Sequence, residues 1–502
     1  MSSAADALSL QLELLSITQN PPLPSEVSLA RIIVSKAKED LRNLKTKIAE
    51  LKLQEQRLQD HLDHHERIIF SINRLPTELL SLIFLLAVPS LPLEHNPPPA
   101  TVQSPWLVSQ VCKLWREIAL TSQLLWAFPI VFPTTQSPSQ LKLHLERAGN
   151  TGLHPFLTGS SRGRYFPRLL GSVMEHSPQW VTLILSFDWT PLQDRLAALK
   201  GHVGRLKELQ IDGIWGEESD AALGEGQRLT AFAVAPQLRT VKIRNVCEPA
   251  VSLYLPWHQL TEYRALGSAH EHLSVLKLCS NLVTLDLSFP TAVTIPQGSP
   301  VQAVLPHLVH LHIGDAEFLR VMCLPILEEI IIQRTDPDGD ALLPLLDLIR
   351  LDRPLLRNIS LVHSVLVTPT LVTILQESPT ITALRIHVRR GDTAAVDELL
   401  RQLTLTPDVN HTSTAAARLA PNLTTLEFNG RGTFDQARFA SMLESRWRGR
   451  GCAQIRRVVV RSTNKAALTS KTMQRLRALA REGLHVSVKA FSFFTDDVIE
   501  PT

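Results

Sequence analysis

Apolar residues recur at alternating steps of three and four between Ala30 and Ile69, and charged residues fill most positions between them. Only Glu55 and His65 interrupt this series. A heptad pattern sustained over about five repeats predicts a coiled-coil helix. We place this helix at residues 29–70, after a leader at 1–28 that ends in prolines. The pattern leaves open whether the helix forms a homodimer or packs on its own chain. The apolar positions are Ala30, Val34, Ala37, Leu41, Leu44, Ile48, Leu51, Leu58, Leu62 and Ile69.

The next apolar segment, from Leu79 to Val88, is almost continuous. Pro76 suits the first turn of a helix, where its missing N–H needs no partner, and Glu78 complements the helix dipole. We therefore expect a helix from about Pro76 to Val88, followed by a loop with six prolines between 89 and 105. The segment "WLVSQVCKLWREIAL" predicts a second helix, and a short third element ends at Leu125-Trp126. Residues 71–133 thus form an expected all-α three-helix domain.

One motif recurs through the rest of the chain, residues 134–502: an apolar residue, two others, an apolar residue, one other, and a third apolar residue. The final apolar-x-apolar has the period of a β-strand, and runs such as "DALLPLLDLIR" and "TAAVDELLRQL" between copies are helical in pattern. The copies begin at Trp180, Leu206, Leu238, Leu282, Leu308, Leu327, Leu356, Ile381, Leu423 and Ile455, with a weaker one at Leu260.

One strand and one helical return per unit predict an α/β solenoid of short parallel strands. The array resembles leucine-rich repeats, although its spacing is irregular and the usual Asn/Cys position is mostly missing. An ordinary α/β domain with parallel strands remains the alternative. In a solenoid, the residue between the last two apolar positions of each motif points to the concave surface. These residues are polar and chemically mixed, which favours binding of a protein surface: Gln210, Lys242, Asp286, His312, Ser360, Arg385 and Glu427.

The three-helix segment resembles the F-box family. The family's motifs occur in order, as "LPTELL" from Leu75, Ile83-Phe84, "VCKLW" from Val111, and Leu125-Trp126. The proline-rich connection departs from the short one usual in the family, which puts partner contacts from that loop in doubt. The resemblance implies binding to a Skp-family adaptor, and through it to a cullin. The matching positions that it assigns to adaptor binding are Leu75, Pro76, Leu79, Ile83, Phe84, Val111, Cys112 and Trp115.

Composition narrows the class of protein. The chain has 502 residues, 44% hydrophobic and 20% charged, which indicates globular structure and more than one domain. A net charge of +3 gives no reason to expect nucleic acid or an anionic membrane as a partner. Five scattered cysteines indicate a reducing compartment, and neither a signal peptide nor a membrane span is recognisable. We expect a cytoplasmic or nuclear protein.

Four motifs that could carry chemistry fail on closer reading. "GSSRG" around Ser161 matches a nucleophile elbow, but "RYFP" follows where a helix is needed. The histidines of "HLDHHE" lie on a charged helix, with no carboxylate or cysteine motif to complete a metal site. "DPDGD" is followed by Ala341 at the sixth position, where a calcium loop requires glycine. "RWRGRG" from Arg446, with Arg456, Arg457 and Arg461, is the one basic cluster, which we interpret as a solvated edge. We expect no metal, no cofactor and no catalysis by this chain.

These observations predict the substrate-recognition subunit of an SCF-type cullin–RING ubiquitin ligase. The F-box would bind the adaptor, and the solenoid would bind an unidentified protein target. The alternatives are a scaffold that binds the adaptor without delivering a target, or an interaction protein that acts through its coiled coil. An esterase built on Ser161 is a third hypothesis.

Overall fold

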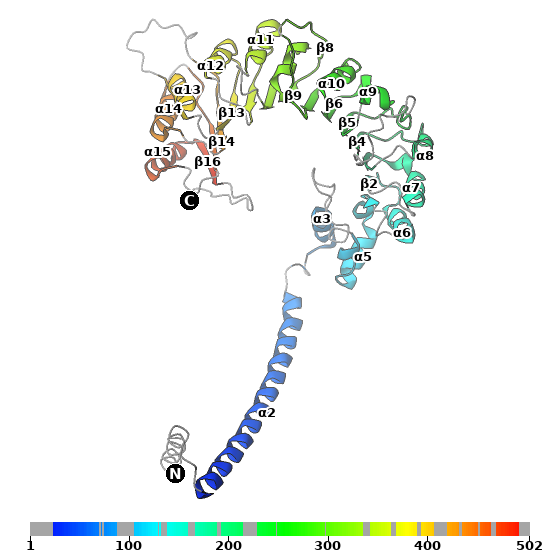
Figure 1. Cartoon of the computed structure of the whole chain (residues 1–502), viewed down its shortest axis with the longest axis vertical. Helices are drawn as coiled ribbons and strands as arrows, with labels where there is room; N and C mark the ends of the chain where they lie inside the picture. The colour runs from blue at the N-terminus through cyan, green and yellow to red at the C-terminus, as the bar shows by residue number, and fades with distance from the viewer. Residues whose placement is uncertain are drawn as a thin grey trace. The chain divides into compact units, whose positions relative to one another are not determined.

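The computed structural model divides into two compact units, Met1–Phe84 and Leu85–Thr502, which we describe separately (Figure 1). The leader at 1–23, the proline-rich loop, Ser161 and "DPDGD" lie outside the residues that the structure describes. The described residues are 24–69, 72, 75–87, 105–128, 130–131, 138–158, 166–187, 192–213, 228–246, 248–296, 298–334, 342–362, 368–388, 393–405, 419–430, 434–449, 452–462 and 468–490.

The first unit contains one long helix, α2 (Pro24–Ile69), of 46 residues. It covers the range expected for a coiled coil and begins a few residues earlier, at Pro24. Its apolar heptad positions are exposed wherever their side chains are described, except for the half-buried Ala30. Helix α3 (Thr77–Ala87) follows directly after Pro76, which confirms the helix expected there.

After the last residues of α3, the second unit continues with short helices: α4 (Pro105–Val108), α5 (Lys113–Thr121) and the 3-10 helix η2 (Gln123–Trp126). The single helix expected over this segment is wrong, because the chain breaks at Cys112. This residue is extended (φ −155°) and caps α5, its Sγ accepting a hydrogen bond from the Trp115 N–H. The local hydrogen bond offers the backbone an alternative to a continuous helix.

Trp126 anchors these helices in a common core. Its ring is buried and its Nε1–H donates to the Ala119 carbonyl at 2.8 Å. The guanidinium of Arg147 lies 4.3 Å and 4.6 Å from the rings of Trp106 and Trp126, close enough for cation–π attraction. Arg147 belongs to α6 (Pro138–Ala148), which ends before Gly149, a glycine with a positive φ of 59°.

The described residues of the second unit form a parallel sheet of fourteen strands. The strands follow one another in the sheet in chain order, so each strand between the first and the last pairs with the sheet strand before it and the one after it. Figure 1 shows the sheet of this unit curving as an arc, with helices along its outer side. This α/β architecture is solenoid-like: sequential order and one helical layer differ from a doubly wound domain, in which helices cover both faces.

The sheet strands are β1 (Ile130–Val131), β2 (Phe156–Thr158), β3 (Thr182–Ser186), β4 (Glu208–Asp212), β5 (Thr240–Arg244), β6 (Glu262–Leu266), β7 (Thr284–Ser288), β9 (His310–Asp315), β11 (Glu329–Arg334), β12 (Asn358–Leu361), β13 (Ala383–Val388), β14 (Thr425–Gly430), β15 (Arg457–Ser462) and β16 (His485–Ala490). Two further strands, β8 (Ala303–Val304) and β10 (Met322–Cys323), form a small parallel pair. β1 starts before residue 134, inside the range assigned to the helical domain.

The connections contain α7 (Phe166–Met174), α8 (Gln193–Ala197), α9 (Pro249–Ser252), α10 (Ala269–Leu276), α11 (Leu343–Asp352), α12 (Thr368–Glu377), α13 (Thr393–Leu403), α14 (Gln436–Arg448) and α15 (Ser470–Arg481). The 3-10 helices η3 (Ser177–Gln179), η5 (Trp257–Gln259) and η6 (Ala316–Val321) complete them.

Each sequence motif becomes one strand, and the strand starts two residues after the first apolar residue of the motif. This holds for all eleven copies, including the weaker one that forms β6. The first apolar residues, from Trp180 to Ile455, are buried. Because the motif repeats its internal spacing, neighbouring strands align with the same offset and their leucines stack in continuous buried rows. The sequence pattern missed β16, which carries no such motif.

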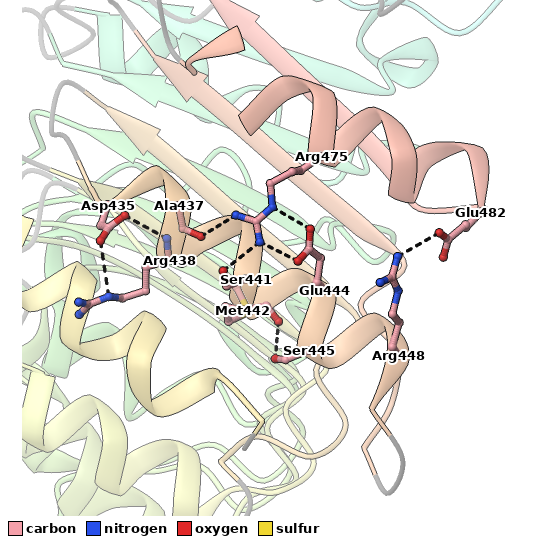
Figure 2. A network of polar contacts seen from close by, with 10 residues as sticks. All are labelled: Asp435, Ala437, Arg438, Ser441, Met442, Glu444, Ser445, Arg448, Arg475 and Glu482. Carbon is pink, nitrogen blue, oxygen red and sulfur yellow. Dashed lines mark hydrogen bonds and ion pairs between the residues drawn. The ribbon is translucent and has the colours of Figure 1, made fainter. Parts of the chain in front are cut away.

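Charged contacts join the last two helices of the array (Figure 2). Arg475 of α15 donates to both carboxylate oxygens of Glu444 on α14, at 2.8 Å and 2.6 Å, and to the Ser441 hydroxyl at 2.9 Å. One turn further along α14, Arg448 reaches Glu482 at 3.4 Å. The bidentate pair fixes how the final repeat sits on the one before it.

The interpretation of the basic cluster as a solvated edge is wrong for its first member. Arg446 is completely buried, and its guanidinium donates to the backbone carbonyls of Leu403, Ala420 and Leu419. Arg448, two residues later, is exposed as expected. Arg446 thus serves as an internal cross-link between backbone segments that are distant in sequence.

Candidate protein-binding surfaces

All seven residues predicted for the concave surface lie in one row across the sheet. Strand register places each opposite its neighbour, from Gln210 beside Lys242 to Arg385 beside Glu427. We call this line the central row. Its members in order are Phe156, Ile184, Gln210, Lys242, Arg264, Asp286, His312, Ile331, Ser360, Arg385, Glu427, Val459 and Ser487.

The central row lies on the inner face of the arc because side chains alternate along each strand. Residues on either side of it, such as Leu209 and Ile211, are buried beneath the helices. Arg264 and Ser487 also belong to the row and were not predicted. Arg264 lies within the weaker motif copy that starts at Leu260, and the alternation of that copy would have been enough to find it.

The first half of the row carries paired charges of both signs. Lys242 Nζ lies 2.7 Å from Glu208, and Asp286 lies 3.1 Å from His312 Nδ1. Arg264 pairs with Glu262 at 2.8 Å on its own strand. These groups are half-exposed, so each pair contributes little to stability, about 0–1 kcal/mol. They keep the charges ordered on a surface that solvent or a partner can reach.

The last strands of the row are organised around Glu427. This carboxylate is 5% exposed, and it binds Arg385 at 2.9 Å and Arg461 at 2.5 Å. One buried anion therefore orients two guanidinium groups that remain partly exposed. Arg457, on the neighbouring strand, is exposed as well. This end of the inner face carries more positive than negative charge.

Two predicted contact residues are buried and cannot offer an open surface. Glu427 acts through the arginines that it holds. Ser360 is 6% exposed, and its Oγ has no hydrogen-bond partner among the described residues. The expectation of seven exposed polar positions is therefore wrong for these two residues. Their burial depends on adjacent strands, and the pattern of a single strand does not show it.

A second candidate surface lies on α3, a helix with one buried and one exposed apolar face. Leu80 and Phe84 are buried, whereas Leu79, Ile83 and two further leucines are exposed. The exposed residues follow the i, i+3, i+4, i+7 spacing of one helix face: Leu79, Leu82, Ile83 and Leu86. Phe84 belongs to the core, so we leave it out of the contact surface. Leu75 is half-buried, and Pro76 is exposed.

The break between α4 and α5 exposes apolar side chains of the second unit. Val111 is 61% exposed, Cys112 is exposed, and Trp115 is half-buried. Ile118 and Ala119, on the other side of α5, are buried. Val111 and Cys112, which lie just before α5, are thus exposed, whereas the side of α5 with Ile118 and Ala119 faces the core.

The described residues give no sign of a metal or membrane site. No group of three or more metal-binding side chains comes together among them. No helix in the described ranges combines the length and apolarity needed to cross a bilayer. Comparison with models of known protein families finds no match for this chain, and comparison with curated proteins finds no similar sequence. The motif residues and these surfaces are therefore the features of this chain that bear on its function.

Proposed function

We propose that this chain is the substrate-recognition subunit of an SCF-type cullin–RING ubiquitin ligase, working in the cytoplasm or the nucleus. Its F-box-like segment would bind a Skp-family adaptor, and its leucine-rich-repeat-like solenoid would bind the protein target. The exposed apolar face of α3 carries this proposal, because two of its four residues, Leu79 and Ile83, are positions of the F-box motif.

The exposed face of α3 is costly for an isolated chain. Leu86 is 79% exposed, and the three other members of the face are also open to water. Scattered apolar residues are normal on protein surfaces, but a continuous apolar helix face marks an interaction site. Covering such residues with another protein recovers about 25 cal/mol for each Å² of apolar surface buried.

The inner face of the sheet suits a protein target better than a small molecule. Charges of both signs occur along it, from Glu208 on β4 to Arg461 on β15. A surface of this kind can set the orientation and register of a partner through charge complementarity. A target held there would gain effective concentration near a ubiquitin-charged enzyme, so the bond-making chemistry would belong to the partners.

Adaptor binding can be tested with the full chain and a purified Skp-family adaptor. We expect the double variant Leu79→Asp/Ile83→Asp to bind the adaptor at least tenfold more weakly, because two charges would enter an apolar contact. The matched control is Leu143→Asp/Leu278→Asp, which changes two exposed leucines of the second unit. Equal adaptor affinity for the two variants, or no adaptor binding by the unmodified chain, would refute the F-box proposal.

Target delivery needs a separate readout. The assembled adaptor–cullin complex should be recovered with this chain, and a protein captured by the solenoid should acquire ubiquitin in the reconstituted reaction. We expect Arg385→Glu/Arg461→Glu to reduce target capture while leaving adaptor binding unchanged. Recovery of adaptor and cullin without ubiquitination of any captured protein would favour the scaffold hypothesis instead.

A further inference from the structure

Helix α2 presents a long apolar stripe that stays exposed among the residues of its unit that the structure describes. We call this stripe the α2 seam. Its large side chains are between 45% and 70% exposed, which is far from the burial of a core position. The members of the seam are Val34, Leu41, Leu44, Ile48, Leu51, Leu58 and Leu62. A helix of this length with a heptad seam is suited to pairing with a second helix.

The charges that flank the seam are mostly positive. In the heptad, the seam supplies positions a and d, and the e positions carry Arg31, Lys38, Lys45 and Lys52. The g positions include one acid, Asp40, and a further lysine, Lys47. All six side chains are exposed along α2. These flanking positions lie at the border of any helix pair and govern which partner is accepted.

A second copy of α2 fits these borders poorly in either orientation. In a parallel pair, each g residue meets the e residue five positions later in the other chain. Asp40 would then attract Lys45, but Lys47 would repel Lys52. In an antiparallel pair, e positions face e positions, so the basic row would meet itself. The positions next to the seam thus give no net attraction in a parallel pair and repulsion between the e positions in an antiparallel pair.

Glu55, a charged residue within the seam, also disfavours a parallel homodimer. It occupies an a position within the seam, between Leu51 and Leu58. In a parallel homodimer its carboxylate would lie against the same carboxylate of the second copy, in a layer largely removed from water. Two like charges in such a layer oppose pairing, whereas a lysine or arginine across from Glu55 would compensate its charge.

We propose that the α2 seam binds an amphipathic helix of a different protein, with acidic residues beside its own apolar stripe and a basic residue facing Glu55. The seam supplies apolar contact, and its basic borders together with Glu55 select against a second copy of this chain. This inference is independent of the adaptor and target sites, since it concerns only α2.

The probe for the experiment is a designed heptad peptide with Ile at a, Leu at d, Glu at e and g, and one Lys placed to meet Glu55. A second peptide is identical except for Lys at every e and g position. Using the full chain, we expect the acidic peptide to bind at least tenfold more tightly than the basic one, with the difference shrinking as salt is raised. Sedimentation equilibrium should show the unmodified chain as a monomer at micromolar concentration.

Two triple variants of equal net charge distinguish an effect of the border residues on peptide binding from an effect of the overall charge of α2. Lys38→Glu, Lys45→Glu and Lys52→Glu change the border, and this variant should lose its preference for the acidic peptide. Lys36→Glu, Arg42→Glu and Arg57→Glu change the outer face of α2 by the same charge, and this variant should keep the preference. Equal loss in both variants would overturn the proposal.

Other outcomes also decide against it. A stable dimer of the unmodified chain that Leu44→Asp abolishes would identify a second copy as the occupant of the seam. Failure of both peptides to bind would mean that the chain covers its own seam. Substitution Glu55→Leu should raise self-association of the full chain by at least tenfold, and an unchanged monomer would remove Glu55 from the argument.

Discussion

Removing the Arg446 side chain tests whether buried backbone acceptors hold the last repeats together. In Arg446→Met, a flexible apolar chain of similar length replaces the guanidinium, and the carbonyls of Leu403, Leu419 and Ala420 lose their donors. These carbonyls come from the end of α13 and from the segment before β14. Ala420 also has a positive φ of 45°, an unfavourable conformation that the hydrogen bond helps to hold.

The magnitude follows from two opposing effects. Each buried acceptor left without a donor costs about 1–3 kcal/mol. Methionine offsets part of that loss because burying it does not require desolvating a charge. Burial already lowers the pKa of Arg446, which shows that the site disfavours the cation on solvation grounds alone. We therefore expect Arg446→Met to lower the free energy of unfolding by about 3–5 kcal/mol.

Urea titration of the full chain, followed by hydrogen exchange over residues 393–490, would measure this effect. Repeat arrays can lose terminal repeats separately, so exchange localises the loss. The control is Arg448→Met, which removes an exposed arginine from the same helix turn and should cost less than about 1 kcal/mol. If Arg446→Met proves no more destabilising than this control, the cross-linking role is refuted.

Three further outcomes are expected. Burial lowers the pKa of His144 to about 4, so the unfolded chain binds a proton at this residue more readily than the folded chain does. The free energy of unfolding should therefore fall by about 3 kcal/mol as the pH drops from about 6.5 towards 4. In urea unfolding, His144→Phe should remove this part of the pH dependence. Burial raises the pKa of Cys279 to about 12, so little of this thiol is in the reactive thiolate form, and iodoacetamide should label the exposed Cys112 first. Labelling of both cysteines at equal rates, followed by mass spectrometry, would contradict the buried position of Cys279. Hydrogen bonding from Arg475 lowers the pKa of Glu444. The stability that this carboxylate contributes is present at neutral pH and is lost as the pH falls through the lowered pKa. Glu444→Gln should therefore lower the thermal midpoint at pH 7 more than the matched variant Glu482→Gln does, and the two midpoints should lie closer together in acid.

Local spacing was sufficient to predict eleven of the fourteen strands of the sheet. Each motif, such as the one from Leu238, contains its own start, its buried positions and its outward position, so no information from the rest of the chain is needed. The break at Cys112 was not predictable in the same way. Its surroundings are compatible with a helix, and the competing hydrogen bond, which the Trp115 N–H donates to the Cys112 Sγ, forms only when Cys112 is extended.

The sequence alone determined the central row of the sheet, because an identical spacing in every repeat imposes an identical register on parallel strands. It also determined the α2 seam and its basic borders, since both depend only on helical periodicity. The tertiary structure decided which polar residues are buried. Arg446 and Glu427 lie next to segments that are roughly 26 to 43 residues away along the chain. Solvent access at such positions depends on neighbouring repeats, which local patterns do not describe.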